Sequence, residues 1–279
     1  MCPNCRAFIT AADRTCPYCG NQVGPRAIDL RSPANFLGGL IPPSYFTAVL
    51  ILLINLALFV ATCWLSGSFM GDVNARALWA LGAKLGYSVF VQHEYWRLVT
   101  AGFLHGSLLH IAFNSWALYV LCPQVEEFYG TSRLIVVYFV ATVCGFYLSA
   151  RMNPGISIGA SAGIMGLIGA MVAFGAVNQS SLGRAIRNNY LGLLGINLAL
   201  GFMRGSNVDN WAHIGGFAGG FAVAYIAGTP IRSSQTKEAI WRLAAAASLM
   251  LTAYCFWLMY RNFPTPEELR ELLQSGGVG

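Results

Sequence analysis

Long apolar stretches separated by short polar ones run from about residue 45 to residue 260. A helix needs about 20 mostly apolar residues to cross a bilayer, and the pattern predicts seven crossings. The first and last are long, and the only charged residue in either is Arg242, near the start of the last. The fourth and fifth are short and rich in glycine, which favours burial inside a helix bundle. The predicted spans are 46–65, 108–122, 134–150, 162–177, 190–203, 211–228 and 240–260.

Composition supports an integral membrane protein. Of the 279 residues, 56% are hydrophobic and only 10% are charged, whereas soluble domains carry about 25% charged residues. The net charge of +6 is spread along the chain without a basic run. It therefore relates to membrane orientation, and we expect the lipid bilayer, not nucleic acid, as a partner.

The distribution of basic residues predicts the orientation. With a cytoplasmic N-terminus, ten of the 17 basic residues lie inside and seven outside, in the sense of the positive-inside rule. Seven spans then place the C-terminus outside. We expect a bacterial inner membrane, because the chain opens on cysteines and polar residues and shows no targeting peptide.

The polar and apolar stretches divide the chain into five parts. They are a cytoplasmic head (1–24), a linker (25–44), a helical core (45–228), a loop with the seventh transmembrane helix (229–262) and an external tail (263–279). Within the core, residues 66–102 are rich in aromatics, which suits a segment lying in the membrane interface. In the tail, Thr265 followed by Pro266, Glu267 and Glu268 predicts the start of a short helix.

Four cysteines in the head have the spacing of a metal site. They form a C-x2-C, ten-residue, C-x2-C array, in which two tight turns direct four thiolates to one tetrahedral Zn²⁺. The alternative is two disulfides, which a cytoplasmic location disfavours. A zinc-ribbon-like head with a closed, structural zinc is predicted, and it could bind a cytoplasmic partner. The predicted ligands are Cys2, Cys5, Cys16 and Cys19.

Polar side chains gather at the ends of three apolar spans. Ser161 lies in the run Gly159-Ala160-Ser161-Ala162-Gly163 at the start of the fourth span, and His213 begins the sixth. His110 and Asn114 share one face of the second span because they are four residues apart. Hydrogen bonding between helices explains any one of them alone, but polar residues within spans are costly and mark function by default.

These side chains suit nucleophilic catalysis. A serine nucleophile needs a base close enough to take its proton, and the developing oxyanion needs hydrogen-bond donors such as an amide or an imidazole N–H. Gly216 and Gly220 follow His213 on its own helix face, so the sixth span can approach the fourth closely enough for His213 to reach Ser161. Asp209 lies in a loop and no third acid is evident, so a Ser-His dyad without a catalytic cofactor is predicted.

In these motifs the sequence resembles the rhomboid intramembrane serine proteases. Tyr95-Trp96-Arg97 and Phe103-Leu104-His105 look like the W-R region of that family, and His110 with Asn114 matches its H-x-x-x-N motif. Glu126 with Gly130 is similar to an E-x-x-x-G motif after the second helix. Gly159-Ala160-Ser161 matches G-x-S, and His213, Gly216 and Gly220 match H-x-x-G-x-x-x-G. The resemblance covers roughly residues 45–228.

The resemblance implies an all-α polytopic fold, a six-helix rhomboid-like bundle to which this chain adds a seventh transmembrane helix. It implies Ser161 as nucleophile, His213 as base, and His110 and Asn114 as oxyanion-hole donors, under a cap loop at 205–210. This sequence departs from the family at Ala162, where many members have glycine, and at Met165, where an aromatic often packs against the catalytic histidine. The residues expected to give structural support are His105, Trp96, Arg97, Glu126, Gly159, Gly216 and Gly220.

The predicted function is that of a serine endopeptidase that cleaves transmembrane protein substrates near their external ends. The alternative is a catalytically silent rhomboid-like binder or chaperone of membrane proteins, which has no need to keep both Ser161 and His213. A transporter is a third class, but it predicts ionisable residues near the middle of several spans. The interiors of the first, third and seventh spans contain none.

Overall fold

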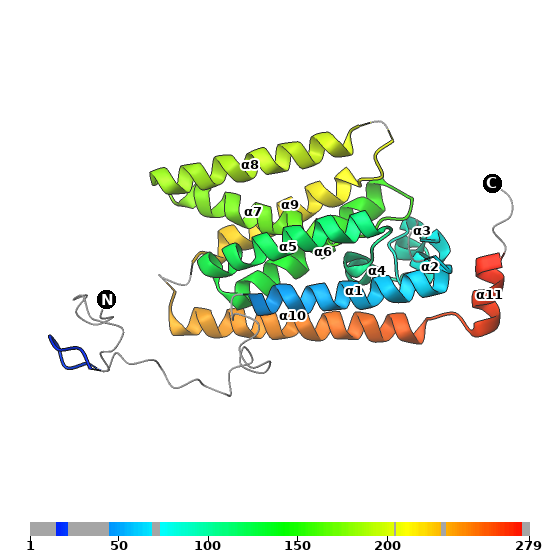
Figure 1. Ribbon diagram of the computed structural model, residues 1–279, viewed down its shortest axis with the longest axis horizontal. Helices are drawn as coiled ribbons and strands as arrows, with labels where there is room; N and C mark the ends of the chain where they lie inside the picture. Colours follow the sequence, from blue (N-terminus) through cyan, green and yellow to red (C-terminus); the bar gives the residue numbers. More distant parts are fainter. Residues whose placement is uncertain (1–14, 22–44, 69–72, 204, 230–232, 275–279) are drawn as a thin grey trace. The chain divides into compact units, whose positions relative to one another are not determined.

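The computed structural model describes residues 15–21 and 45–274, apart from 69–72, 204 and 230–232. The chain divides into two compact units, residues 1–46 and residues 47–279. In Figure 1 the second unit is a bundle of long helices, with shorter helices between the first two long ones. The elements are α1 (Phe46–Ser66), α2 (Ala75–Ala80), α3 (Gly86–Phe90), α4 (Arg97–Thr100), η3 (Ala101–Phe103), α5 (Leu108–Tyr129), α6 (Thr131–Met152), α7 (Ser161–Val177), α8 (Ser181–Gly201), α9 (Asn210–Ala227), α10 (Gln235–Arg261) and α11 (Pro266–Gln274).

All seven predicted spans are helical, and each lies at the predicted place. α5 and α8 were predicted too short by the largest margins. α5 continues through Pro123 to Tyr129, and α8 begins at Ser181 because Ser180 caps it by accepting a hydrogen bond from the Gly183 N–H. The extra turns contain polar residues, so the apolar pattern did not predict them.

The long helices fall into two kinds. Among the described residues, α1, α5, α6 and α10 are each long and apolar enough to cross a membrane. Large apolar side chains on them face outward, including Trp64 (73% exposed) and Phe113 (69% exposed), as lipid contact requires. α7 is shorter and lies almost wholly in the core, where it packs against α5, α6, α8 and α9. The protein is thus an all-helical integral membrane protein.

The segment between α1 and α5 contains the short helices α2, α3, α4 and η3. Arg97 of α4 is almost fully buried, and its guanidinium donates to the carbonyl oxygens of Trp79 (2.6 Å) and Ala83 (3.1 Å) and to the Glu94 carboxylate. The rings of Trp79 and Trp96 stack on the same guanidinium, 4.7 and 4.5 Å away. One arginine therefore fixes the path of this whole segment.

The seventh long helix, α10, is attached to the bundle at two levels. Near its start, Glu238 receives two hydrogen bonds from Arg133 of α6, at 2.7 and 2.9 Å. Ser233 accepts from the same guanidinium, and the Trp241 ring lies over it. Farther along, Phe256 packs edge-on against Phe103 of η3. The extra span is therefore docked on the other helices by a salt bridge and by apolar contacts.

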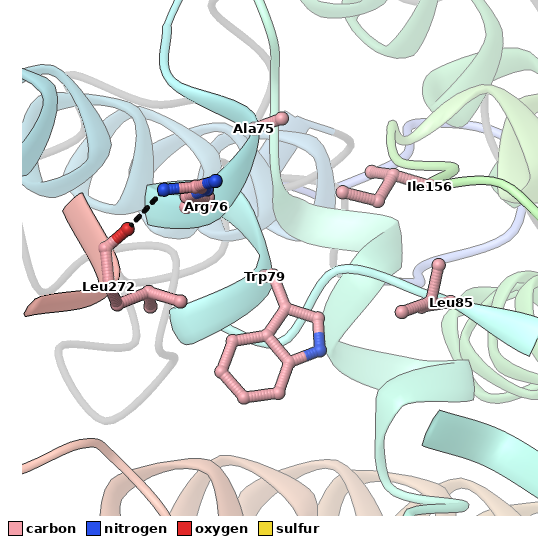
Figure 2. Close-up of a pocket in the computed structure, with 6 residues that line it drawn as sticks. All are labelled: Ala75, Arg76, Trp79, Leu85, Ile156 and Leu272. Atoms are coloured by element: carbon pink, nitrogen blue, oxygen red, sulfur yellow. Dashed lines mark hydrogen bonds between the residues drawn. The ribbon is translucent and has the colours of Figure 1, made fainter. Parts of the chain in front are cut away.

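The predicted tail helix is present as α11. Thr265 and Glu268 form the reciprocal capping bonds, since the Glu268 carboxylate accepts from the Thr265 N–H and the Thr265 hydroxyl accepts from the Glu268 N–H. Figure 2 shows the Arg76 guanidinium donating to the Leu272 carbonyl oxygen at 2.7 Å. Around this contact lies a cavity of about 250 Å³, lined by Ala75, Arg76, Trp79, Leu85, Ile156 and Leu272.

Candidate active site

Ser161 is the first residue of α7, as predicted. Just before it, at Gly159, the backbone passes close to the His110 side chain. Gly159 has a φ of +119°, which favours glycine. A Cβ atom built there would lie 2.7 Å from His110 Nε2 and 3.6 Å from Ser161 Oγ. His110 and Ser161 thus flank one glycine, and only glycine leaves room for the imidazole beside the serine.

His213 lies in the first turn of α9, 5% exposed. Asp209 caps this helix, since its carboxylate accepts hydrogen bonds from the N–H groups of Trp211 and Ala212. A helix start with satisfied N–H groups is a rigid platform. His213 and Ser161 therefore both lie in the first turn of a helix.

The glycine faces bring α7 and α9 together as the sequence predicted. A Cβ on Gly216 would lie 2.2 Å from the Ala162 carbonyl oxygen, and one on Gly220 would lie 2.3 Å from the Gly166 backbone. Real side chains never approach so closely, so the two backbones touch. Ser161 and His213 are each within a turn of this contact.

The two side chains are not hydrogen-bonded to one another. Among the described residues, no bond joins Ser161 Oγ to the His213 ring, and the buried His213 Nδ1 has no hydrogen-bond partner. Catalytic hydrogen bonds are often long without substrate and tighten in the reacting complex. The hydrogen bonds of the Asp209 carboxylate go to the start of its own helix and to Ser149 and Asn153 at the end of α6. The Ser-His dyad stays a prediction.

The tautomer of His110 follows from its neighbours. Its Nδ1 accepts a long hydrogen bond (3.5 Å) from the Gly106 N–H. In a neutral ring that acceptor role places the proton on Nε2, the nitrogen beside Gly159. His110 therefore presents an N–H next to the glycine that lies two residues before Ser161.

Asn114 lies one turn further along α5, buried beneath His110. Its Nδ2 donates one N–H to the His110 carbonyl oxygen at 3.1 Å. An amide has two such protons, so the second remains for another acceptor. The predicted oxyanion donors share one helix face, as their spacing required.

His105 is fully buried, and its ring packs edge-on against His110, with centroids 5.0 Å apart. Burial, with a smaller contribution from His110, lowers the pKa of His105 to about 3. The ring is therefore neutral at physiological pH and supports His110 by packing. Arg97 braces the segment before it through its bonds to Trp79 and Ala83 and its contact with the Trp96 ring.

The expected position of the E-x-x-x-G motif after the second helix needs correction. Glu126 lies inside the last turn of α5 and not after that helix, because α5 runs on to Tyr129 and ends at Gly130, with φ +77°. Glu126 accepts a hydrogen bond from the Thr131 hydroxyl. The nearby Arg133 of α6 pairs with Glu238 of α10.

Sequence reasoning missed the group that holds the loop before Ser161. Lys84, fully buried, donates from Nζ to the carbonyl oxygens of Asn153 (2.8 Å) and Gly155 (2.9 Å). Its backbone pairs with Ser157 in a short antiparallel bridge. A lone lysine among apolar residues gives no spacing signal, so only its burial in the fold identifies it.

The zinc site stays a prediction. Cys2 and Cys5 lie outside the described residues. Cys16 and Cys19 lie in a tight turn, in which the Gly20 N–H donates to the Cys16 carbonyl oxygen and the Cys16 N–H donates to Asn21. Such a turn is the shape that a C-x2-C metal knuckle needs, and the remaining cysteine pair would have to complete the site.

Known proteins match this chain across the residues of the site. The family profile described as the Rhomboid domain matches residues 92–230, which include each site residue from Trp96 to Gly220. The rhomboid protease GluP of Bacillus subtilis (strain 168) is 36% identical over 205 residues, or 74% of this chain and 39% of that protein. Rhomboid-like protease 3 of Toxoplasma gondii is 33% identical over 178 residues, or 63% of this chain and 66% of that protein.

A plant protein shows the same likeness. RHOMBOID-like protein 7 of Arabidopsis thaliana is 33% identical over 157 residues, which are 55% of this chain and 49% of that protein. The chain thus spans between about two fifths and two thirds of the length of these relatives. The cysteine head and α10 lie outside the matched domain.

Proposed function

The chain belongs to the rhomboid family, and from this premise we propose that it is an intramembrane serine endopeptidase that cleaves transmembrane segments of membrane proteins. The observation that carries the proposal is the packing of α7 on α9. It sets the start of one helix, with Ser161, beside the start of another, with His213, and His110 faces the same point from α5. The relatives named as proteases support the same reaction class.

The chemistry runs through two tetrahedral intermediates. His213 accepts the proton of the Ser161 hydroxyl as Oγ attacks the scissile carbonyl carbon, and the carbonyl oxygen becomes an oxyanion. His110 Nε2–H, the free N–H of Asn114 and the Ser161 backbone N–H stabilise that oxyanion. Collapse breaks the C–N bond, and His213 donates its proton to the departing amine. Water then attacks the ester, His213 takes its proton, and the serine is released.

The substrate must expose a carbonyl before this attack. Hydrogen bonds within a transmembrane helix shield each peptide carbonyl, so the helix must unwind locally. Glycine and other residues of low helix propensity lower the cost of unwinding by up to about 1 kcal/mol each. We therefore infer a preference for substrates with small, helix-weakening residues near the external end, because Ser161 and His213 both lie at that end in the predicted orientation, with the N-terminus in the cytoplasm.

The test uses a single-span reporter protein in liposomes together with the purified full chain. Wild type is expected to cleave the reporter and Ser161→Ala to leave it intact, because the alanine has no nucleophile. Ser181→Ala is the matched control, since this exposed serine begins α8 away from the site, and it should cleave like wild type. Equal cleavage by wild type and Ser161→Ala would overturn the proposal.

The second candidate is a silent membrane-protein binder of the same fold. One observation favours it: the Ser161 hydroxyl and the His213 ring are not hydrogen-bonded here. If the protein is a binder, wild type and the Ser161→Ala variant should bind the reporter equally well. Neither should cleave it. A reporter that copurifies with wild type without cleavage would select this candidate.

A further inference from the structure

Asp209 does more than cap a helix. Besides the N–H groups of Trp211 and Ala212, its carboxylate accepts hydrogen bonds from the Ser149 hydroxyl and from Asn153 Nδ2 (3.2 Å), both at the end of α6. Burial alone would raise the pKa of Asp209, but bonds from Ser149, Ser157 and the Ala212 N–H, and the Lys84 charge, lower it below the ordinary value. Asp209 is thus an anion that joins the start of α9 to the end of α6.

Lys84 holds the loop that follows α6, residues 153–157, from its other side. Its ammonium donates to the carbonyl oxygens of Asn153 and Gly155, while its backbone exchanges hydrogen bonds with Ser157 (2.9 and 3.2 Å). The neighbouring Gly86 N–H donates to Pro154. Residues 153–157 are therefore clamped between a buried cation, Lys84, and a half-buried anion, Asp209. This stretch leads directly to Gly159, whose N–H donates to Ala101 of η3.

We propose that Lys84, Ser149, Asn153, Ser157 and Asp209, here called the interloop cluster, act as one charged positioning unit that sets the loop before Ser161 against the helix start that carries His213. Lys84 fixes the nucleophile's side and Asp209 fixes both sides. No member touches the reacting atoms, so these are positioning residues. The inference rests on the proposed protease function and deepens it, because it names what controls the distance between the two catalytic groups.

The surroundings of Lys84 set the pKa of its ammonium group. Burial lowers the pKa of Lys84 from 10.5 to about 8, and the Asp209 charge opposes that shift. The other charged groups nearby are engaged elsewhere: Arg97 donates to Glu94 and Ala83, and Arg151 of α6 lies 4.6 Å over the Phe90 ring. A cavity of about 300 Å³ beside Asp209, lined in part by Pro154 and Trp211, gives solvent a route to the cluster.

The pH dependence has opposite signs for activity and for stability. Below about pH 8 Lys84 is charged and clamps the loop; above it the neutral amine donates more weakly and no longer attracts Asp209. Activity should therefore fall as the pH rises through about 8. Because the unfolded chain holds this proton up to about pH 10.5, this group makes stability rise between about pH 8 and 10.5. If the protein simply unfolded at alkaline pH, activity and stability would fall together.

The experiment measures the rate at which a fluorophosphonate labels Ser161 in the detergent-solubilised full chain, between pH 6.5 and 9.5, with the thermal midpoint recorded in parallel. We expect the wild-type rate to decline through about pH 8 without loss of stability. Lys84→Met should label about tenfold more slowly at pH 7, since small misplacements of catalytic groups cost this much or more, and should lose the inflection. Lys237→Met, at an exposed lysine of α10, is the matched control.

Asp209→Asn keeps the size of the side chain and a capping oxygen but removes the charge. It should also label about tenfold more slowly, and the double variant with Lys84→Met should be little slower than either single variant, because coupled groups are not additive. Should Lys84→Met fail to fold, Asp209→Asn and the wild-type pH profile still decide. Wild-type rates and an unchanged inflection in both variants would overturn the inference, whereas unlabelled wild type would instead contradict the proposed protease function.

Discussion

At the level of single residues, the site depends on glycines that carry no side chain. Gly159, Gly216 and Gly220 each stand where a Cβ would collide with another segment. Their lack of a side chain lets α7 pack directly on α9 and lets His110 lie beside Gly159. Spacing along the sequence was sufficient to predict the two glycines on α9, because a helix repeats every three to four residues. It could not predict Lys84, whose partners lie about 70 residues away in sequence and are brought to it only by folding.

Gly216→Val tests the close approach of α7 and α9. Its Cβ would sit 2.2 Å from the Ala162 carbonyl oxygen, so α9 must move away and carry His213 with it. We expect reporter cleavage to fall by about 100-fold or more, with a loss of about 1–3 kcal/mol in the free energy of unfolding. Gly195→Ala, with no atom within 4 Å of its Cβ, should leave cleavage unchanged. Wild-type activity in Gly216→Val would refute the packing argument.

At the level of elements, the start of the seventh span is held by an ion pair that the sequence did not reveal. Glu126 is closer to Arg133 in the chain, but it lies inside α5 and bonds to Thr131, whereas Glu238 reaches Arg133 from α10. Arg133 is 1% exposed. A buried cation that loses its counterion is strongly destabilising, so this pair should decide whether α10 stays docked.

Glu238→Gln is therefore expected to loosen α10. The thermal midpoint in detergent should fall, and Cys255, which is half-buried on α10 against the core, should react faster with maleimide when labelling is resolved by residue. Glu267→Gln, at an exposed position in α11, serves as the comparison and should change neither quantity. An unchanged midpoint together with unchanged Cys255 labelling would mean that apolar contacts such as Phe256 with Phe103 hold the helix alone.

At the level of the whole molecule, the apolar pattern was enough to predict the helical bundle but not its internal division. Only α1, α5, α6 and α10 are long and apolar enough to be recognised as spans from the described residues alone. The short, glycine-rich fourth span was predicted to lie inside the bundle, and α7 confirms this. The same prediction for the fifth span was wrong, because α8 buries only Gly183 and Tyr190. The folded segment between α1 and α5 escaped prediction, since its order comes from Arg97 and from contacts with the distant loop at 153–157.

The central claim is that Ser161 and His213 form one catalytic unit. The most direct test is peptide mapping by mass spectrometry after treatment of the folded, detergent-solubilised chain with a fluorophosphonate. The account predicts one adduct, on Ser161, that is present in wild type and lost in His213→Ala, because the hydroxyl then has no base to take its proton. An adduct on another residue, or equal labelling of Ser161 with and without His213, would contradict it.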